Sequence, residues 1–135
     1  MVEDMLALKF ESKPENILKV EKFVEQVCSE YGIVDEMYGN VLVALSEGAN
    51  NAIFHGNQED SNKFVEIKVV EKNDEKVVFS IADEGSGFDH ENIPDPTAPE
   101  NLEKPTGRGV FLMTQMADEH KFVKGGSEVI LTFKY

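Results

Sequence analysis

Three short segments of this chain carry side chains and glycines of the kinds that bind a charged ligand. The first lies in a predicted helix over residues 34–55, where Glu47 and Asn51 are about one turn apart. A carboxylate and an amide at that spacing lie on the same side of a helix, so together they can hold an oxygen-binding cation such as Mg²⁺. The small residues Ala44 and Gly48 flank the pair and predict an open face. The same spacing also fits a solvent-exposed face on which the pair binds nothing.

The second segment, Asp83-Glu84-Gly85-Ser86-Gly87, comes directly after a predicted strand. Asp83 at the strand end offers an oxygen that can accept a hydrogen bond from an exocyclic amine of a ligand. Gly85 and Gly87 permit positive φ angles and a close approach of the backbone to that ligand. A turn without a ligand has the same composition, and the spacing of the acidic residues does not match a calcium-binding EF-hand loop.

The third segment, Thr106-Gly107-Arg108-Gly109, opens a predicted helix over residues 109–120. Glycines before a helix N-terminus leave backbone N–H groups free for an anion, and the helix dipole favours negative charge there. The proline-rich stretch before it, residues 88–106, predicts a long loop that serves as a lid. The alternative is a flexible hinge into the helix. The chain has neither the GxxxxGK[ST] sequence of a P-loop nor a Rossmann GxGxxG after a strand.

Two helices are predicted before the central strands, and they must position the first segment. Ser12-Lys13-Pro14-Glu15 has the form of a capping box with proline at an early helical position, so the first helix begins here and ends at Gly32. In the second helix, residues 34–55, apolar residues repeat at helical spacing. They predict a buried face distinct from the side that carries Glu47 and Asn51.

Strands are predicted on both sides of these helices by short apolar runs bounded by turn residues. Their ranges are 5–10, 64–71, 76–82, 121–124 and 128–135, with hairpin turns at Asn73-Asp74 and Gly125-Gly126. The order β-α-α-β-β-loop-α-β-β predicts an α+β fold, a two-layer α/β sandwich with three helices on one face of a mixed, mostly antiparallel sheet. We therefore expect a single domain over residues 1–135, with the lid at about 88–106.

The composition agrees with one globular domain and limits the kinds of partner that the protein can bind. Of 135 residues, 41% are hydrophobic and 29% are charged. The formal net charge of −13 argues against direct binding to nucleic acid, because phosphates would be repelled over most of the surface. No apolar run is long enough to span a membrane.

The location is predicted from the N-terminus and from cysteine usage. Glu3 and Asp4 stand where a signal peptide would have lysine or arginine. Cys28, the single cysteine, falls in a helical pattern and is interpreted as a buried residue that packs in the core rather than as a catalytic thiol. A lone cysteine forms no internal disulfide, so we expect a cytoplasmic protein.

Taken in order, the three segments resemble the ATP-binding motifs of the GHKL superfamily, which includes gyrase B, the Hsp90 chaperones, MutL and histidine kinases. Residues 47–56, EGANNAIFHG, resemble the N box in the ExxxNAxxHG form of the anti-sigma-factor serine/threonine kinases. Residues 83–88 resemble the G1 box, and residues 107–113 resemble the G2 box in the short-lid style of that subfamily. Residues 126–129 resemble a final Gly-Thr-x-Val, with serine in place of threonine. The resemblance covers nearly the whole chain and implies the Bergerat, or histidine-kinase-like ATPase, fold.

The resemblance also implies a role for each matching residue. Glu47 would be the general base, and Asn51 the side-chain ligand of Mg²⁺. Asp83 would accept a hydrogen bond from the adenine amine of ATP. The other matches would shape the pocket around these three: Gly85 and Gly87 in the adenine turn, Gly107, Arg108 and Gly109 against the phosphates, Ser127 supporting Asp83 through its hydroxyl, and His55 in the pocket wall.

The function implied by the resemblance is that of an ATP- and Mg²⁺-dependent anti-sigma factor that phosphorylates an antagonist protein on serine or threonine in a partner-switching system. Its partners would be a sigma factor and a STAS-type antagonist, and a homodimer is a further implication. Two alternatives stay open. One is a nucleotide-dependent binding switch without phosphotransfer, against which an intact Glu47 counts. The other is the catalytic ATPase domain of a sensor histidine kinase, a family that lacks the ExxxNAxxHG form.

Overall fold

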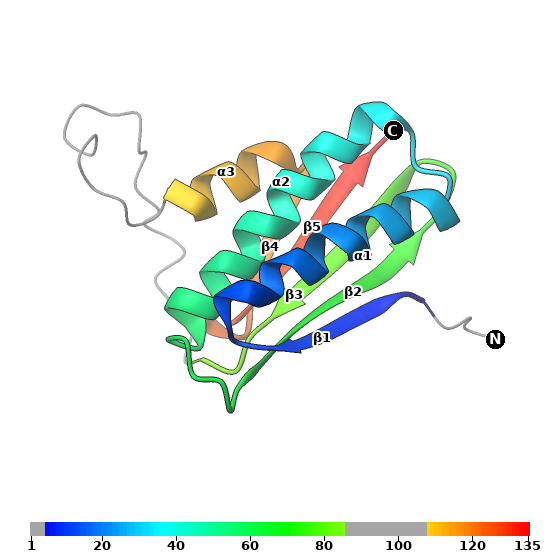
Figure 1. Cartoon of the computed structure of the whole chain (residues 1–135). Coiled ribbons are helices and arrows are strands. Elements are labelled where there is room, and N and C mark those ends of the chain that lie inside the picture. Colours follow the sequence, from blue (N-terminus) through cyan, green and yellow to red (C-terminus); the bar gives the residue numbers. More distant parts are fainter. Residues whose placement is uncertain (1–4, 86–107) are drawn as a thin grey trace.

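The computed structural model describes residues 5–85 and 108–135, the side chain of Arg108 excepted. Helices and strands form two layers: Figure 1 shows all three helices on one side of the sheet, and α2 contacts both α1 and α3. The predicted two-layer α/β sandwich is therefore confirmed. Its strands are β1 (Ala7–Glu11), β2 (Phe64–Lys72), β3 (Lys76–Ala82), β4 (Glu119–Val123) and β5 (Glu128–Lys134), and its helices are α1 (Ile17–Glu30), α2 (Asp35–Asn51) and α3 (Arg108–Met116).

The strands form one sheet in the order β1-β2-β3-β5-β4. Every pairing among the described strands is antiparallel, so the expected mixed sheet is wrong in that detail. Strand β1 lies beside β2 although α1 and α2 separate them in the chain, and β3 lies beside β5. The β3–β5 register pairs Ala82 with Glu128, which places Asp83 next to Ser127. The sheet therefore brings together two candidate site residues that are distant in sequence.

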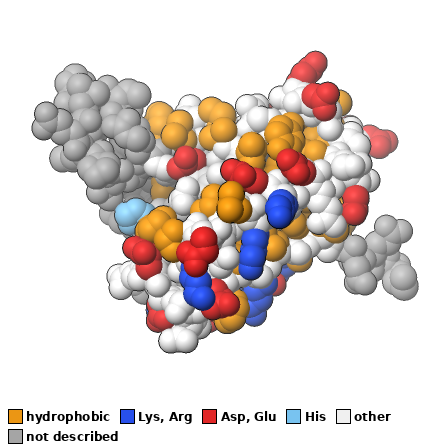
Figure 2. Space-filling model, in the orientation of Figure 1, with side chains coloured by type: hydrophobic (Ala, Val, Ile, Leu, Met, Phe, Trp, Pro, Cys, Tyr) orange, Lys and Arg blue, Asp and Glu red, His pale blue; other side chains and the backbone are white. Residues whose placement is uncertain are grey.

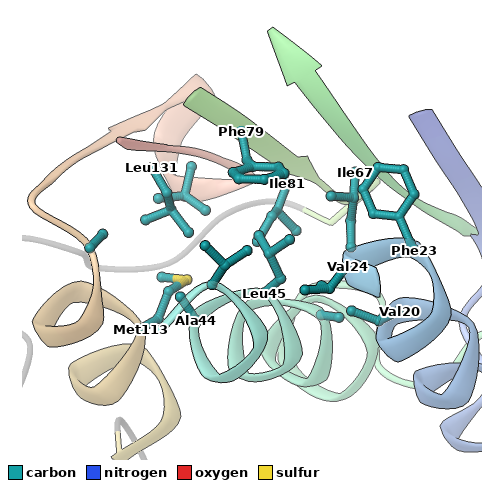
Figure 3. Close-up of a cluster of buried hydrophobic side chains, with 14 of the residues drawn as sticks. Val20, Phe23, Val24, Ala44, Leu45, Ile67, Phe79, Ile81, Met113 and Leu131 are labelled. Atoms are coloured by element: carbon teal, nitrogen blue, oxygen red, sulfur yellow. The ribbon is translucent and has the colours of Figure 1, made fainter. Parts of the chain in front are cut away.

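The hydrophobic core fills the space between the sheet and the helices. Burial alternates along β2 and β5, so one face of each strand points at the helices. Figure 3 shows Leu45 of α2 and Met113 of α3 among the sheet residues Phe79, Ile81 and Leu131. Each of these five side chains is at most 3% exposed. Close packing of this kind fixes the position of α2, the helix that carries Glu47.

The first helix begins differently from the prediction. The Ser12 hydroxyl, expected to cap the helix, instead donates to the carbonyl of Lys63 at 3.0 Å. Residues Pro14–Asn16 form a 3-10 turn without a side-chain cap, and α1 starts only at Ile17. The predicted capping box is wrong, because Ser12 is fully buried and bonded to the segment that leads into β2.

Two later boundaries also differ. The helix predicted over residues 34–55 is α-helical only to Asn51 and continues as a π-helical turn, Ala52–Gly56. The helix predicted over residues 109–120 ends at Met116, because the backbone N–H of Asp118 donates to Thr132 and the chain joins β5. Strand β4 therefore begins at Glu119 rather than at residue 121.

On the face of the molecule that Figure 2 shows, the charged side chains do not form a single acidic patch. Acidic, basic and apolar side chains are interspersed over the helices there. Among the described residues, none of the helices has the length and apolar character required to cross a lipid bilayer.

Candidate functional site

A cavity of ≈ 190 Å³ lies where the C-terminal end of α2 meets the start of α3. Its wall carries a carboxylate, two amides and an imidazole, which are groups suited to a polar, charged ligand. The lining residues are Glu47, Asn50, Asn51, Phe54, His55, Gly109 and Val110. The cavity thus brings together the first and third of the predicted segments.

Glu47 and Asn51 both face this cavity, as their spacing predicts. Each side chain is half-buried, so it is held by the fold and still open to a ligand. The small residues beside them do not leave an open face, however. Ala44 and Gly48 are buried, and a Cβ at Gly48 would overlap Ile81 of β3. The absence of side-chain bulk there lets α2 pack closely on the sheet, and the expectation of an open face is wrong.

The start of α3 lies against Glu47. A Cβ added at Gly109 would stand only 2.8 Å from Oε2 of Glu47, closer than real Cβ atoms approach other atoms. Glycine at this position therefore permits the contact. The first N–H groups of a helix have no intrahelical partner, and the dipole makes that end positive. An anion in this cavity would meet the start of α3 close to the Glu47 carboxylate.

Asp83 lies just beyond β3, adjacent to the cavity wall rather than in it. Its carboxylate packs on Gly56, which follows the lining residue His55; a Cβ at Gly56 would overlap the Asp83 carboxylate. A Cβ at Gly85 would likewise overlap the carbonyl of Gly56. Two glycines thus let the turn after β3 touch the end of the α2 segment. Glu47, Asn51 and Gly109 therefore share one cavity, whereas Asp83 lies outside its lining and contacts Gly56, the residue after His55.

The Asp83 carboxylate is half-buried and bonded within its own turn. Its Oδ1 accepts a hydrogen bond from the backbone N–H of Gly85 at 2.7 Å. Burial raises the pKa of Asp83 above its ordinary value, while the Gly85 N–H and the charge of Lys63 oppose that shift. Within residues 5–85 and 108–135 no hydrogen bond is made to Oδ2, so this partly desolvated carboxylate is suited to accept one from a ligand.

Ser127 is not bonded to Asp83 through its hydroxyl. That hydroxyl donates to the carbonyl of Lys124 at 3.0 Å. The link to Asp83 is made by the backbone, because the N–H of Asp83 donates to the carbonyl of Ser127 at 2.9 Å. The other predicted phosphate and turn groups, Gly87, Gly107, the side chain of Arg108 and the lid at about 88–106, lie outside the described residues.

Asn57, to which the sequence assigned no role, lies beside the Asp83 turn without lining the cavity. Its side chain is fully buried and makes three hydrogen bonds. Its Nδ2 donates to Ser12 Oγ at 2.6 Å and to the carbonyl of Phe64 at 3.0 Å. Its Oδ1 accepts from the backbone N–H of Glu84 at 2.7 Å. An asparagine after a glycine is also common in a plain turn, so the sequence carries no signal for this role.

Cys28 has no part in this site. It is half-buried on α1 and packs against the hydrophobic core. Burial raises the pKa of its thiol, and the charge of Asp35 adds to the shift. A raised pKa keeps the thiol protonated and unreactive, which agrees with the interpretation of Cys28 as a packing residue.

Comparison with known proteins identifies the class of this fold and site. Residues 10–133 match the family model of the histidine kinase-like ATPase domain. The chain therefore belongs to that family, and the resemblance to the GHKL ATPases is confirmed. Membership of an ATPase family makes this an ATP-binding chain.

Individual relatives show in more detail which proteins this chain is similar to. The chain is 28% identical over 138 residues to the serine-protein kinase RsbW of Oceanobacillus iheyensis, covering 98% of this chain and 87% of that protein. It is 25% identical over 139 residues to the RsbW of Staphylococcus aureus, with the same coverage of both chains. Its fold is similar to part of the structure of the RsbU and RsbW domains of Rv1364c from Mycobacterium tuberculosis, with a TM-score of 0.66 and 16% identity. That match covers 98% of this chain and 32% of the other.

Proposed function

We propose that this protein is an ATP-dependent serine/threonine protein kinase that acts as an anti-sigma factor and phosphorylates an antagonist protein. The observation that carries the proposal is the cavity in which Glu47 and Asn51 of α2 face the start of α3, with Gly109 against the Glu47 carboxylate. The similarity to proteins named serine-protein kinase, over 98% of this chain, supports the reaction type.

Glu47 is proposed as the general base. Its carboxylate takes the proton from the acceptor hydroxyl as that oxygen bonds to the γ-phosphorus of ATP, and the bond from phosphorus to the bridging oxygen breaks to leave ADP. The free N–H groups at the start of α3 would lie against the phosphates and stabilise their charge. Positioning and neutralisation supply most of the catalysis in phosphoryl transfer, and both are available in this cavity.

The cavity also fits a magnesium ion. Asn51 and Glu47 line it, and each side chain carries an oxygen of the hard kind that Mg²⁺ prefers. In residues 5–85 and 108–135 no three His, Cys, Asp or Glu side chains gather to hold a metal by themselves. A site with one or two protein oxygens suits Mg²⁺, which is usually bound together with water and nucleotide phosphates. We assign Asn51 as the direct ligand; the bound ion would neutralise phosphate charge.

Asp83 is proposed to select adenine. The exocyclic N6 amine of ATP would donate to its carboxylate, whereas GTP presents a carbonyl oxygen at that position and would be repelled. The packing of Asp83 on Gly56 supports this role, because it joins the adenine side of the site to the segment that carries Glu47 and Asn51.

The proposed partners are a sigma factor and a STAS-type antagonist. A kinase of this type would bind the sigma factor, release it when the unphosphorylated antagonist competes, and inactivate the antagonist by phosphorylation. We also propose that the protein acts in the cytoplasm, because ATP is available there. A homodimer is also part of the proposal, by similarity to the subfamily.

Incubation of the purified protein with γ-labelled ATP and a purified STAS-type antagonist tests this function. We expect label on a serine or threonine of the antagonist, identified by mass spectrometry, and none when Mg²⁺ is chelated. Binding of ATP and of the antagonist without transfer of label would support the nucleotide-dependent switch instead. Transfer of label to a histidine would support the histidine-kinase alternative.

A further inference from the structure

We infer that Asn57 is a positioning residue that holds the Asp83 turn against the end of the α2 segment and thereby sets the affinity for adenine nucleotides. This inference rests on the proposed function, because it assigns Asn57 to the ATP site. Asn57 itself does not line the cavity. It would act through the backbone of Glu84, the residue that follows Asp83.

The hydrogen bonds of Asn57 connect three separate parts of the chain. Its Nδ2 reaches Ser12, which follows β1, and Phe64, which begins β2. Its Oδ1 accepts the backbone N–H of Glu84, which follows β3. The donors and acceptor of one amide thus meet three strand ends, in a side chain that is 0% exposed. A buried amide bonded on both its oxygen and its nitrogen is held in one orientation.

The π-helical turn explains how Asn57 reaches this place. The N–H of Asn57 donates to the carbonyl of Ala52 at 2.8 Å, a wider span than in an α-helix. This widened turn brings Gly56 against Asp83 while Asn57 points into the protein. Such π-helical turns occur often at functional sites. Here the turn joins the helix of Glu47 and Asn51 to the turn of Asp83.

The backbone around Asp83 is held from both sides. The N–H of Asp83 itself donates to Ser127, and the N–H of Glu84 donates to Asn57. The Glu84 carboxylate in turn accepts the N–H of Phe64. Of these bonds, only the one to Asn57 ties the turn to the segment that carries the metal and base residues. Loss of its Oδ1 would leave the N–H of Glu84 without its partner and free the turn to move away from Gly56.

Calorimetric titration of MgATP into Asn57→Ala tests this role. We expect the Kd to rise about tenfold, with the stoichiometry of the folded protein unchanged. Ser12→Ala is the matched control, because it removes a buried bond to the same asparagine on the side away from Glu84. We expect Ser12→Ala to lower the Tm and leave the Kd within twofold. This pair separates a loss of positioning from a general loss of stability.

A double-mutant cycle with Asp83→Asn identifies the path of the effect. If Asn57 acts through the adenine contact, Asn57→Ala should add less than about threefold to the Kd once Asp83 is replaced. Should Asn57→Ala fail to fold, Asn57→Asp provides the test, since it keeps an oxygen that can accept the N–H of Glu84. We expect Asn57→Asp to retain MgATP affinity within about threefold despite lower stability.

Three results would overturn the inference. They are a folded Asn57→Ala protein with wild-type affinity, a full tenfold effect that persists in the Asp83→Asn background, and a folded Asn57→Asp protein that loses tenfold in affinity. In each case the wild type would still bind MgATP, so the proposed function would stand. A wild type that binds no MgATP would instead refute the proposed function, and the role of Asn57 with it.

Discussion

The carboxylate of Glu47 occupies the space into which a side chain at Gly109 would project, although the two residues come from different helices. A Cβ at Gly109 would lie 2.8 Å from Oε2 of Glu47, so only glycine fits without displacing that side chain. Gly109, which belongs to the third segment of the sequence, therefore has a structural role in addition to any contact with phosphate. It lets the start of α3 approach the proposed base.

Gly109→Ala should reduce activity without unfolding the protein. The added methyl group would push the Glu47 carboxylate away from its position in the cavity, whereas alanine is a good helix former and preserves α3. Displacement of a catalytic group by about 1 Å can cost about 100-fold, so we expect phosphate transfer to fall by about 10- to 100-fold. Single-turnover transfer to the antagonist and a thermal melt provide the two measurements.

Gly39→Ala is the matched control for that variant. Gly39 lies in α2, is exposed, and a Cβ there would meet nothing within 4 Å. We expect this variant to gain about 1 kcal/mol in stability, because alanine replaces glycine in a helix, and to transfer phosphate at the wild-type rate. Equal losses of activity in Gly39→Ala and Gly109→Ala would show that the contact with Glu47 is not the cause.

Gly48→Ala tests the packing of α2 rather than the chemistry. A Cβ at Gly48 would overlap Ile81 of β3 and stand 3.0 Å from the sulfur of Met113. We expect a loss of about 1–3 kcal/mol in the free energy of unfolding, the usual cost of overpacking a core. Urea denaturation measures it directly. A variant as stable as Gly39→Ala would contradict the close packing seen here between α2, the sheet and α3.

Asp83→Asn should weaken ATP binding and stabilise the protein at neutral pH. Burial raises the pKa of Asp83, so its charged form is less favourable in the folded state than in the unfolded state. Its contribution to stability is therefore present at acid pH and lost as the pH rises through the raised pKa. The neutral amide avoids this loss, by no more than about 1 kcal/mol because the side chain is only partly buried.

Melting curves across pH check the sign of this effect. The Tm of Asp83→Asn should exceed that of the wild type at neutral pH, and the gap should close as the pH falls through the raised pKa. Calorimetry should show weaker ATP binding by the variant, since an amide can place a donor opposite the N6 amine. Equal binding of ATP and GTP by the wild type would remove the proposed role of Asp83.

The sequence predicted the elements and the site best where a signal is local. Apolar periodicity located the second helix, and apolar runs between turn residues located the strands. The ends of β3 match the prediction, because turn residues bound that strand. The spacing of Glu47 and Asn51 predicted that both lie on one side of the helix, and both line the same cavity. Helical geometry alone fixes that relationship, so no tertiary information was needed.

The errors arose where tertiary contacts compete with local preference. Ser12 has the sequence of a helix cap, yet Lys63 and Asn57 bind it from distant segments. The role of Asn57 depends on a π-helical turn and on three strand ends that meet only in the folded protein. Periodicity does not reveal such a turn, since it changes the register of one residue. The buried positions of Ala44 and Gly48 likewise depend on the packing of α2 against β3 and α3.

Glu47→Gln and Asn51→Ala together separate catalysis from nucleotide binding. Glutamine is close to glutamate in shape and helix propensity, so Glu47→Gln should keep α2 and bind ATP within a few-fold of the wild type. Transfer to the antagonist should fall by about 10²–10⁴, the usual contribution of a positioned general base. Asn51→Ala removes the proposed metal ligand and should lose Mg²⁺-dependent ATP affinity together with activity. Calorimetry with and without Mg²⁺, beside single-turnover transfer, measures both variants. If Glu47→Gln transferred phosphate at the wild-type rate, the base would have to be another group, or the protein would be a nucleotide-dependent switch in which Glu47 has no chemical role.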